Sequence, residues 1–542
     1  MMSKNILFII PPYFNIQDYI SNDKESSLPV FTIPYGVLSL ESYIRLNAHC
    51  PVNIELLDLN IEIYKIAKKI NALDEYMDKL ISEKLKKNFD IVAISVLFNS
   101  CYNYIGNILY SIKNRANQPL AVIGGGVATN LYKNILEDFP LLDGLCFSEG
   151  EIPMTDLINS DDYINTMNNH PSWATRNAVE AGKIPIASYV DNLDDIPIFT
   201  YDLVNLDDYN KRSADIYNIN KKDKKELTIH TSRGCPFKCV YCANASLHGN
   251  VVRYMSVDRV IAEVDTMIAR FNMNVLFIED DHFLGNKNRA VEILKKLSDR
   301  NIAIEFLNGI AVYAIDDEIG FWLKKAGATT VHLAVESGSD YVLKELINKP
   351  LRKNKIKKAV DILRKNGIRV HAFIVLGIPG EMDEHRAETM KMIKEVGFDW
   401  VLFFIAIPIV GSRLYDICIK NDYLLEKDFT NHLISKGAIK APGVDPEKIK
   451  QTAYLMNLET NFINNYNMLS GNYEVSILYF QKIVQKYPNH ALAHYALSIC
   501  YGLSGEDIES ANKHADIFQK IIEEDPDWRF YARYFGIDRF AE

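Results

Sequence analysis

The chain has 542 residues, 48% of them hydrophobic, and a formal net charge of −10. It is too long for one hydrophobic core, so we expect about three domains. An acidic chain without a dominant basic face is a poor candidate for nucleic-acid binding. The longest apolar run, 401–410, is too short to span a bilayer, and no signal-peptide cleavage site follows the first apolar stretch. We therefore expect a cytoplasmic protein without a membrane span.

Residues 1–160 alternate short apolar runs with amphipathic helical patterns. The apolar runs are rich in Ile, Val and Leu, which is typical of parallel strands covered on both faces. They lie at 5–10, 53–59, 89–97, 120–126 and 144–150, with helical patterns at 36–46 and 60–87 between the first three. This order predicts an α/β, doubly wound, Rossmann-like domain. The segment 161–226 is polar, charged and marked by prolines, and we expect a linker there, with the lysine run 221–225 as a solvated connector.

A second alternating series, over 227–420, begins at Leu227. The predicted strands are 227–232, 274–280, 302–309, 330–337, 369–378 and 400–409. Helical patterns begin near Ser256, Lys287, Asp316, Lys353 and Asp383, and three of them end at Gly327, Gly367 and Gly397. Six βα units predict a partial (β/α)6 barrel, in which ligands bind at the C-terminal ends of the strands.

The C-terminal region, 421–542, has helical patterns. Pro488 and Pro526 close two similar segments, and Ala493, Leu497 and Tyr501 lie on one helical stripe between them. This spacing is close to that of a tetratricopeptide repeat. The alternative is an ordinary helical hairpin that covers the barrel.

Three of the eight cysteines, Cys235, Cys239 and Cys242, form a C-x3-C-x2-C pattern directly after the first strand of the second series. Three thiolates on one loop suit a soft metal centre. A closed zinc site takes four ligands, and no fourth follows. A cubane cluster is usually held by four cysteines, so three would leave one iron open to another ligand.

This pattern, with aromatic Tyr241 before the third cysteine, resembles the radical S-adenosylmethionine (SAM) superfamily. The resemblance implies a 4Fe–4S cluster whose open iron binds SAM, reductive cleavage of SAM to a 5′-deoxyadenosyl radical, and an electron donor such as flavodoxin or ferredoxin. Structural zinc is the alternative. Further matches to the family's SAM-binding motifs stand at the predicted strand ends: Tyr241, Glu279, Asp280, Asp281, Asn308, Glu336, Ser337, Gly377 and Gly380.

The first domain resembles the cobalamin-binding domain of cobalamin-dependent radical SAM enzymes. Ser95 and Leu97 end one predicted strand, and three glycines end the next. Glycines leave room for a bulky ligand. The residues that carry this resemblance are Pro34, Gly36, Ser95, Leu97, Gly124, Gly125, Gly126, Thr129, Glu149, Gly150 and Glu151. The histidine motif D-x-H-x-x-G is absent, and His49, the only histidine before residue 160, is interpreted as a surface residue. Cobalamin would therefore bind base-off. A flavodoxin-like fold without ligand is the alternative.

The resemblance implies methyl transfer to an unactivated carbon, with cyclisation or rearrangement as related outcomes. A two-cluster methylthiotransferase, with Cys50, Cys101 and Cys146 as extra ligands, is a second hypothesis, and a non-enzymatic adaptor is a third. The substrate, a small molecule or a peptide or carrier, would lie between the two α/β domains. The candidates for lining that space are His282, Tyr313, His332 and His371, and for each of them a satisfied polar side chain inside the barrel is the alternative.

Overall fold

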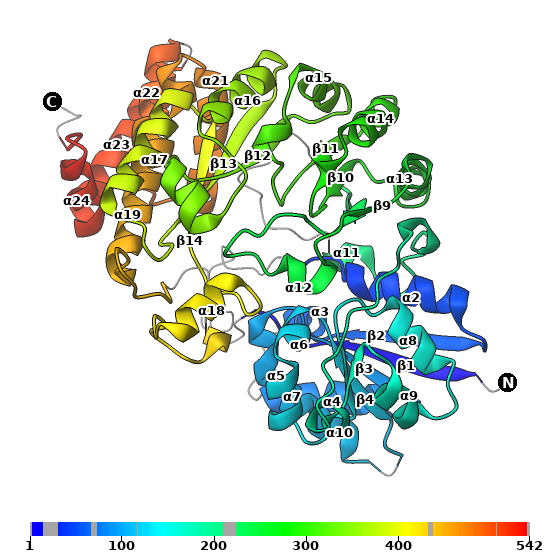
Figure 1. Cartoon of the computed structure of the whole chain (residues 1–542). Coiled ribbons are helices and arrows are strands. Elements are labelled where there is room, and N and C mark those ends of the chain that lie inside the picture. The colour runs from blue at the N-terminus through cyan, green and yellow to red at the C-terminus, as the bar shows by residue number, and fades with distance from the viewer. Residues whose placement is uncertain are drawn as a thin grey trace.

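The computed structural model describes residues 3–14, 31–66, 73–115, 117–209, 224–431, 437–505 and 507–538. It is an α/β protein in which a first domain, a curved barrel domain and a helical tail follow one another along the chain (Figure 1). None of the helices in these ranges has the length and apolar character that a bilayer crossing requires.

The first domain is built on one twisted sheet with the strand order β2-β1-β3-β4-β5-β6. The first five strands are parallel, and β6 pairs antiparallel with β5. The strands are β1 (Lys4–Ile10), β2 (Val52–Asp58), β3 (Ile91–Ser95), β4 (Leu120–Gly124), β5 (Gly144–Cys146) and β6 (Trp173–Ala174). Each of the five predicted apolar runs contains a strand.

Alternate residues of these strands point into two separate apolar cores, one on each face of the sheet. One face is covered by α2 (Tyr35–Asn47), α8 (Glu151–Ile158) and α9 (Tyr163–Asn169). The other is covered by α3 (Leu59–Ile66), α4 (Leu73–Lys84), α5 (Tyr102–Lys113), α6 (Gly126–Asn130) and α7 (Tyr132–Asp138). The α/β, doubly wound arrangement agrees with the prediction. The helical pattern at 60–87 forms two helices, and residues 67–72 between them lie outside the described residues.

Residues 161–209 are not the linker that the sequence suggested. Their first part adds α9, β6 and α10 (Arg176–Glu180) to the first domain. The later part, with η4 (Leu193–Asp195) and α11 (Leu206–Tyr209), sends Leu193, Ile196 and Phe199 into the core of the barrel domain. The prediction of a linker was wrong because a few buried apolar residues are enough to fix a mostly polar segment against two domains. The lysine run at 221–225 lies partly outside the described residues.

The barrel domain contains two parallel three-stranded sheets, β7-β10-β11 and β12-β13-β14. Isolated bridges at Ile304–Ala328 and Ile310–Leu333 connect them, so the described strands form one open, partial barrel. The strands are β7 (Glu226–Ile229), β10 (Val275–Ile278), β11 (Ala303–Glu305), β12 (Thr330–Glu336), β13 (Arg369–Leu376) and β14 (Trp400–Ile405).

The barrel helices begin and end close to the positions that the sequence predicted. The side chains of Ser256, Asn286 and Asp316 accept hydrogen bonds from backbone N–H groups of the first helical turns. Gly397 ends α17 in the left-handed conformation. The helices are α13 (Val257–Phe271), α14 (Lys287–Leu297), α15 (Asp317–Lys325), α16 (Asn354–Lys365) and α17 (Asp383–Val396).

The tail is helical and packs tightly on the barrel. Its helices are α19 (Pro446–Leu458), α20 (Tyr466–Leu469), α21 (Tyr473–Lys486), α22 (Ala491–Ser504), α23 (Ile508–Glu524) and α24 (Pro526–Tyr534). The side-chain amide of Asn461 accepts a hydrogen bond from the Val401 N–H (2.9 Å) and donates one to the Val401 carbonyl (2.8 Å). Tyr479 stacks on Trp400. The tail therefore completes the β14 side of the barrel, and its assignment as tetratricopeptide repeats stays a prediction.

Candidate functional site

The three clustered cysteines lie on a loop that closes on itself. The loop, residues 234–252, leaves β8 (Ser232–Arg233) and returns to β9 (Arg253–Tyr254), and these two strands pair antiparallel. Gly234 has φ +92°, and a Cβ there would lie 2.4 Å from the carbonyl oxygen of Val251. Only glycine fits this entry to the loop. We call residues 234–252 the cysteine loop.

The thiols of the cysteine loop differ in exposure. Cys235 and Cys239 are partly buried, and Cys242 is exposed. Burial raises the pKa of Cys239 to about 11, and the nearby charge of Lys349 opposes that rise. No three His, Cys, Asp or Glu side chains in the described ranges converge on a single metal ion. A cubane does not require such convergence, because its thiolates bind different iron atoms. The spacing on one loop therefore fits a cluster better than a single ion.

The acidic residues after β10 hold the cysteine loop in place. Asp280 is buried, and its oxygens accept hydrogen bonds from the hydroxyl groups of Thr231 (2.6 Å) and Ser232 (2.8 Å). Burial raises the pKa of Asp280 to about 6 despite these bonds. Asp281 accepts a hydrogen bond from the N–H of Gly234 (2.7 Å). The Asp280 carboxylate is thus bonded within the protein, and its contact with SAM stays a prediction.

A partly buried lysine that the sequence analysis missed lies beside the loop, with 15% of its side-chain surface exposed. Lys349 Nζ is 2.9 Å from Glu336 Oε1. Glu336, at the end of β12, has φ +68°. Burial alone would lower the pKa of Lys349, but Glu336 and Cys239 raise it. A lysine before a proline carries no sequence signal, so only the fold could identify this cation next to the cluster cysteines.

The other predicted SAM contacts fall into two groups. Some face the mouth of the barrel: Glu279 is partly exposed, Asn308 is exposed and its amide donates to the Glu279 carbonyl, and Tyr241 is partly buried with its pKa raised by burial and by Glu336. The others are bonded within the protein. Ser337 is buried, with its hydroxyl 3.2 Å from that of Thr389.

The two predicted glycines after β13 lie in a tight turn. The N–H of Gly377 donates to Glu381 (2.6 Å), and the N–H of Gly380 donates to the Pro442 carbonyl (2.9 Å). Glu381 is fully buried, and burial raises its pKa to about 7. The turn is thus fixed by one hydrogen bond within it and one to the segment before α19.

The C-terminal edge of the first sheet carries the residues predicted to bind cobalamin. Ser95 and Gly124 are register partners at the ends of β3 and β4. Leu97 follows with 53% of its surface exposed. Gly125 has φ +109°, and a Cβ there would lie 2.5 Å from the Val96 carbonyl oxygen. By contrast, a Cβ on Gly36, near the start of α2, would meet open space.

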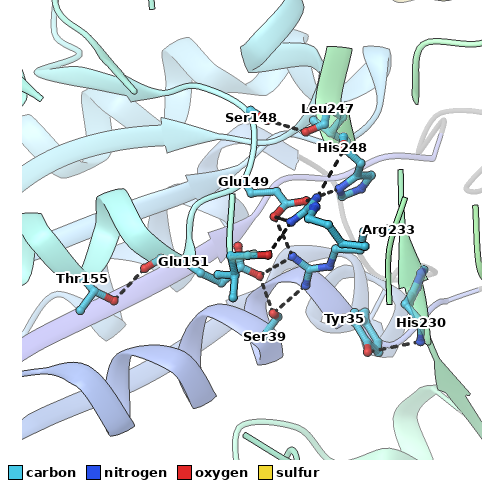
Figure 2. Close-up of polar contacts among 12 residues, drawn as sticks. Tyr35, Ser39, Ser148, Glu149, Glu151, Thr155, His230, Arg233, Leu247 and His248 are labelled. Carbon is cyan, nitrogen blue, oxygen red and sulfur yellow. Dashed lines mark hydrogen bonds and ion pairs between the residues drawn. The ribbon is translucent and has the colours of Figure 1, made fainter. Parts of the chain in front are cut away.

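The acidic residues after β5 do not face that edge freely. Glu149 is bound by Arg253 and His248, and Glu151 by Arg233, all from the barrel domain. Figure 2 shows Glu149 beside His248 and Glu151 beside Arg233. The carboxylates of Glu149 and Glu151 therefore join the two domains, and a contact of either residue with cobalamin stays a prediction.

Three more residues of this group, Thr129, Gly150 and Pro34, are held by contacts within the first domain. Thr129 is buried, and its hydroxyl accepts the Ser148 N–H (2.9 Å). A Cβ on Gly150 would meet the Leu40 side chain at 2.9 Å, and Pro34 caps the start of α2.

The single cysteines of the first domain do not form a second cluster site. Cys101 and Cys146 are buried in the apolar cores on opposite faces of the sheet. Cys50 lies in the turn after α2. Burial raises the pKa of Cys101 to about 11. Thiols separated by a sheet cannot bind one cluster, which disfavours the two-cluster hypothesis.

Two of the four candidate lining residues lie beside the cysteine loop. His282 Nε2 is 2.7 Å from the Tyr313 hydroxyl, and the ring of Phe237, on the loop, packs edge-on against both. The other two are bonded within the protein. His371 is fully buried and bonds to Tyr479 of the tail (2.7 Å) and to His332 (3.3 Å), so His371 lies at the junction of barrel and tail. That either histidine lines the substrate space stays a prediction.

Comparison with known proteins agrees with this geometry. Residues 229–393 match the Radical SAM superfamily. The chain is 27% identical over 475 residues to the cytidylyl-2-hydroxyethylphosphonate methyltransferase of Streptomyces wedmorensis, covering 80% of this chain and 87% of that one.

Two solved structures share the fold at 15% identity. OxsB, a cobalamin-dependent SAM radical enzyme with aqua-cobalamin and SAM bound, has a TM-score of 0.64 and covers 99% of this chain and 80% of its own. The methyltransferase TsrM of Kitasatospora setae, with cobalamin and a [4Fe-4S] cluster, has a TM-score of 0.58 and covers 78% and 76%.

Proposed function

We propose that this chain, whose residues 229–393 form a radical SAM domain, is a cobalamin-dependent enzyme that transfers a methyl group to an unactivated carbon. One observation carries the proposal. The cysteine loop at the mouth of the barrel contacts the C-terminal edge of a doubly wound domain, through packing of α12 (Asn244–His248) against α6. Barrels and doubly wound sheets bind ligands at the C-terminal ends of their strands, and in this chain these two edges lie against each other.

Cys235, Cys239 and Cys242 would hold a 4Fe–4S cluster, and SAM would bind beside them. Lys349 offers a partly buried cation near the loop, suited to a carboxylate. Glu279 and Asn308 offer polar groups at the exposed mouth. When bound, the cluster and SAM supply radical chemistry, and the protein supplies orientation and exclusion of water.

Cobalamin would lie on the edge made by Ser95, Leu97, Gly124 and Gly126. The exposed side chain of Leu97 and the open space over Gly36 fit a large, flat, partly apolar ligand. His49 follows the far end of α2, on the opposite edge of the sheet, and its N–H bonds to Asn159. This placement supports a base-off site without a ligand from His49.

The substrate would lie between these two edges, with His282 and Tyr313 at its side. Burial lowers the pKa of His282, and burial together with the nearby Cys235 raises that of Tyr313 to about 12. Both side chains are therefore neutral at pH 7 and provide hydrogen bonds without charge. The substrate is a small molecule or a peptide or carrier, and the reductant is a flavodoxin or ferredoxin.

Anaerobic reconstitution with iron, sulfide and hydroxocobalamin tests the proposal. We expect about four iron atoms and about one cobalamin per chain. The cobalt(II) state should show no nitrogen splitting in electron paramagnetic resonance. A triplet splitting would contradict the base-off site. Iron near twice this amount, with no cobalamin retained, would favour the two-cluster hypothesis.

A further inference from the structure

The neck of the cysteine loop is bound by the first domain. Arg233 and Arg253 are register partners on β8 and β9, on either side of the neck. Both guanidinium groups contact Glu149. Arg253 Nη2 lies 2.6 Å from Glu149 Oε1, and Arg253 Nη1 lies 2.9 Å from Glu149 Oε2. Arg233 Nη1 lies 3.2 Å from Glu149 Oε2. One carboxylate of the first domain therefore bridges the two strands from which the loop departs.

A second carboxylate completes the contact. Glu151 Oε1 accepts hydrogen bonds from Arg233 (2.8 Å) and from the hydroxyl of Ser39 (2.6 Å) on α2, and Ser39 also accepts one from Arg233 (2.9 Å). Figure 2 shows these side chains converging from both domains. Two buried carboxylates face two guanidinium groups, so the charges balance, as a buried ionic group requires.

The charges persist at neutral pH. Burial alone would raise the pKa of Glu149, but hydrogen bonds from His248 and Arg253 and the charge of Arg233 lower it to about 2. Glu149 is thus ionised beside two guanidinium groups, in a site where the side chains of Glu149, Arg233 and Arg253 are 3%, 10% and 9% exposed. Charge-assisted hydrogen bonds in such a site are stronger than neutral ones.

The first domain also contacts the part of the loop that follows the cysteines. Helix α12 directly follows Cys242, and its His248 Nδ1 is 2.7 Å from Glu149. The Ser148 hydroxyl donates to the carbonyl of Leu247, and a Cβ on Gly126 would lie 3.9 Å from the Leu247 side chain. Gly126 belongs to the predicted cobalamin edge, so this edge packs directly against the cysteine loop.

We propose that Glu149 is a positioning residue that, together with Ser148 and Glu151, fixes the cysteine loop against the first domain. We call these three residues with Arg233, Arg253 and His248 the domain clamp. The clamp sets the distance between the two cofactor edges, and a loop with little regular structure of its own needs such outside contacts to stay ordered. This proposal rests on the proposed function only in that the loop would hold the cluster.

Glu149→Gln tests the clamp, because glutamine keeps the shape and removes the charge. Glu263→Gln is the matched control: Glu263 on α13 is also buried and paired with an arginine, Arg259, within its own helix. Backbone hydrogen–deuterium exchange of 234–252 is measured on the cluster-free full chain. We expect exchange at least about tenfold faster in Glu149→Gln and unchanged in Glu263→Gln.

Wild-type exchange in Glu149→Gln overturns the proposal. If circular dichroism shows that this variant does not fold, Glu151→Gln replaces it, with faster exchange expected and wild-type exchange again overturning the clamp. In reconstituted protein, the resonance of the reduced cluster should broaden in the clamp variant and not in the control. A wild type that takes up no iron would refute the proposed function, while the exchange comparison would still decide the clamp.

Discussion

Two glycines of the first domain have different physical reasons to be glycine, and substitutions separate them. At Gly125, φ is +109° and a Cβ would lie 2.5 Å from the Val96 carbonyl oxygen. Gly125→Ala should therefore destabilise the cluster-free and cobalamin-free protein. A strained backbone of this kind costs about 1–3 kcal/mol, and the contact adds to it. The turn itself requires this glycine, whatever ligand binds.

Gly36 is the opposite case. It lies in the first turn of α2, and a Cβ there meets nothing within 4 Å. Gly36→Ala should leave the melting temperature unchanged or raise it, since glycine in a helix costs roughly 0.5–1 kcal/mol relative to alanine. If Gly36 faces bound cobalamin, Gly36→Leu should instead weaken binding roughly 5- to 150-fold, the equivalent of about 1–3 kcal/mol of overpacking.

The assay pairs thermal melts of the ligand-free variants with spectrophotometric titration of hydroxocobalamin. Gly36→Ala serves as the control for Gly36→Leu, because it changes the backbone propensity with little added volume. Wild-type affinity in Gly36→Leu would show that Gly36 does not line the ligand site. A Gly125→Ala variant as stable as the wild type would refute the argument from backbone strain.

Three more predictions test the cluster, the turn after β13 and the tail. Cys239→Ala should lose most of the iron, measured by colorimetric assay after reconstitution, because the cubane loses one of three thiolates; full iron content would contradict the ligand assignment. Burial raises the pKa of Glu381 from 4.5 to about 7, so its stabilising contribution is complete below pH 4.5 and is lost as pH rises through 7. The free energy of unfolding of Glu381→Gln relative to wild type, from thermal melts, should therefore rise by up to about 3 kcal/mol between pH 4.5 and 7, and a flat difference would count against this. Asn461→Ala should lower the free energy of unfolding by about 1–3 kcal/mol, and with it the melting temperature, because the Val401 N–H and carbonyl lose their partner. An unchanged melting temperature would mean that water replaces the amide.

The sequence alone determined the order of strands and helices and the position of the cysteine loop. Apolar runs covered on both faces predicted the parallel strands, and the capping residues at Ser256 and Gly397 predicted where helices begin and end. These signals are local, because a strand or a cap depends on residues within a few positions. The spacing of Cys235, Cys239 and Cys242 is local in the same sense, which is why it identified the loop without a structure.

Only the tertiary structure decided what the charged and polar side chains do. Glu149 and Asp280 stand at strand ends, where a ligand contact is expected, yet each bonds to the protein around the cysteine loop. His371 lies on a barrel strand but meets Tyr479, more than a hundred positions later in the chain. A buried charge or ring takes the partner that packing brings within hydrogen-bond distance, and that partner comes from another domain or the tail, so no local pattern contains it.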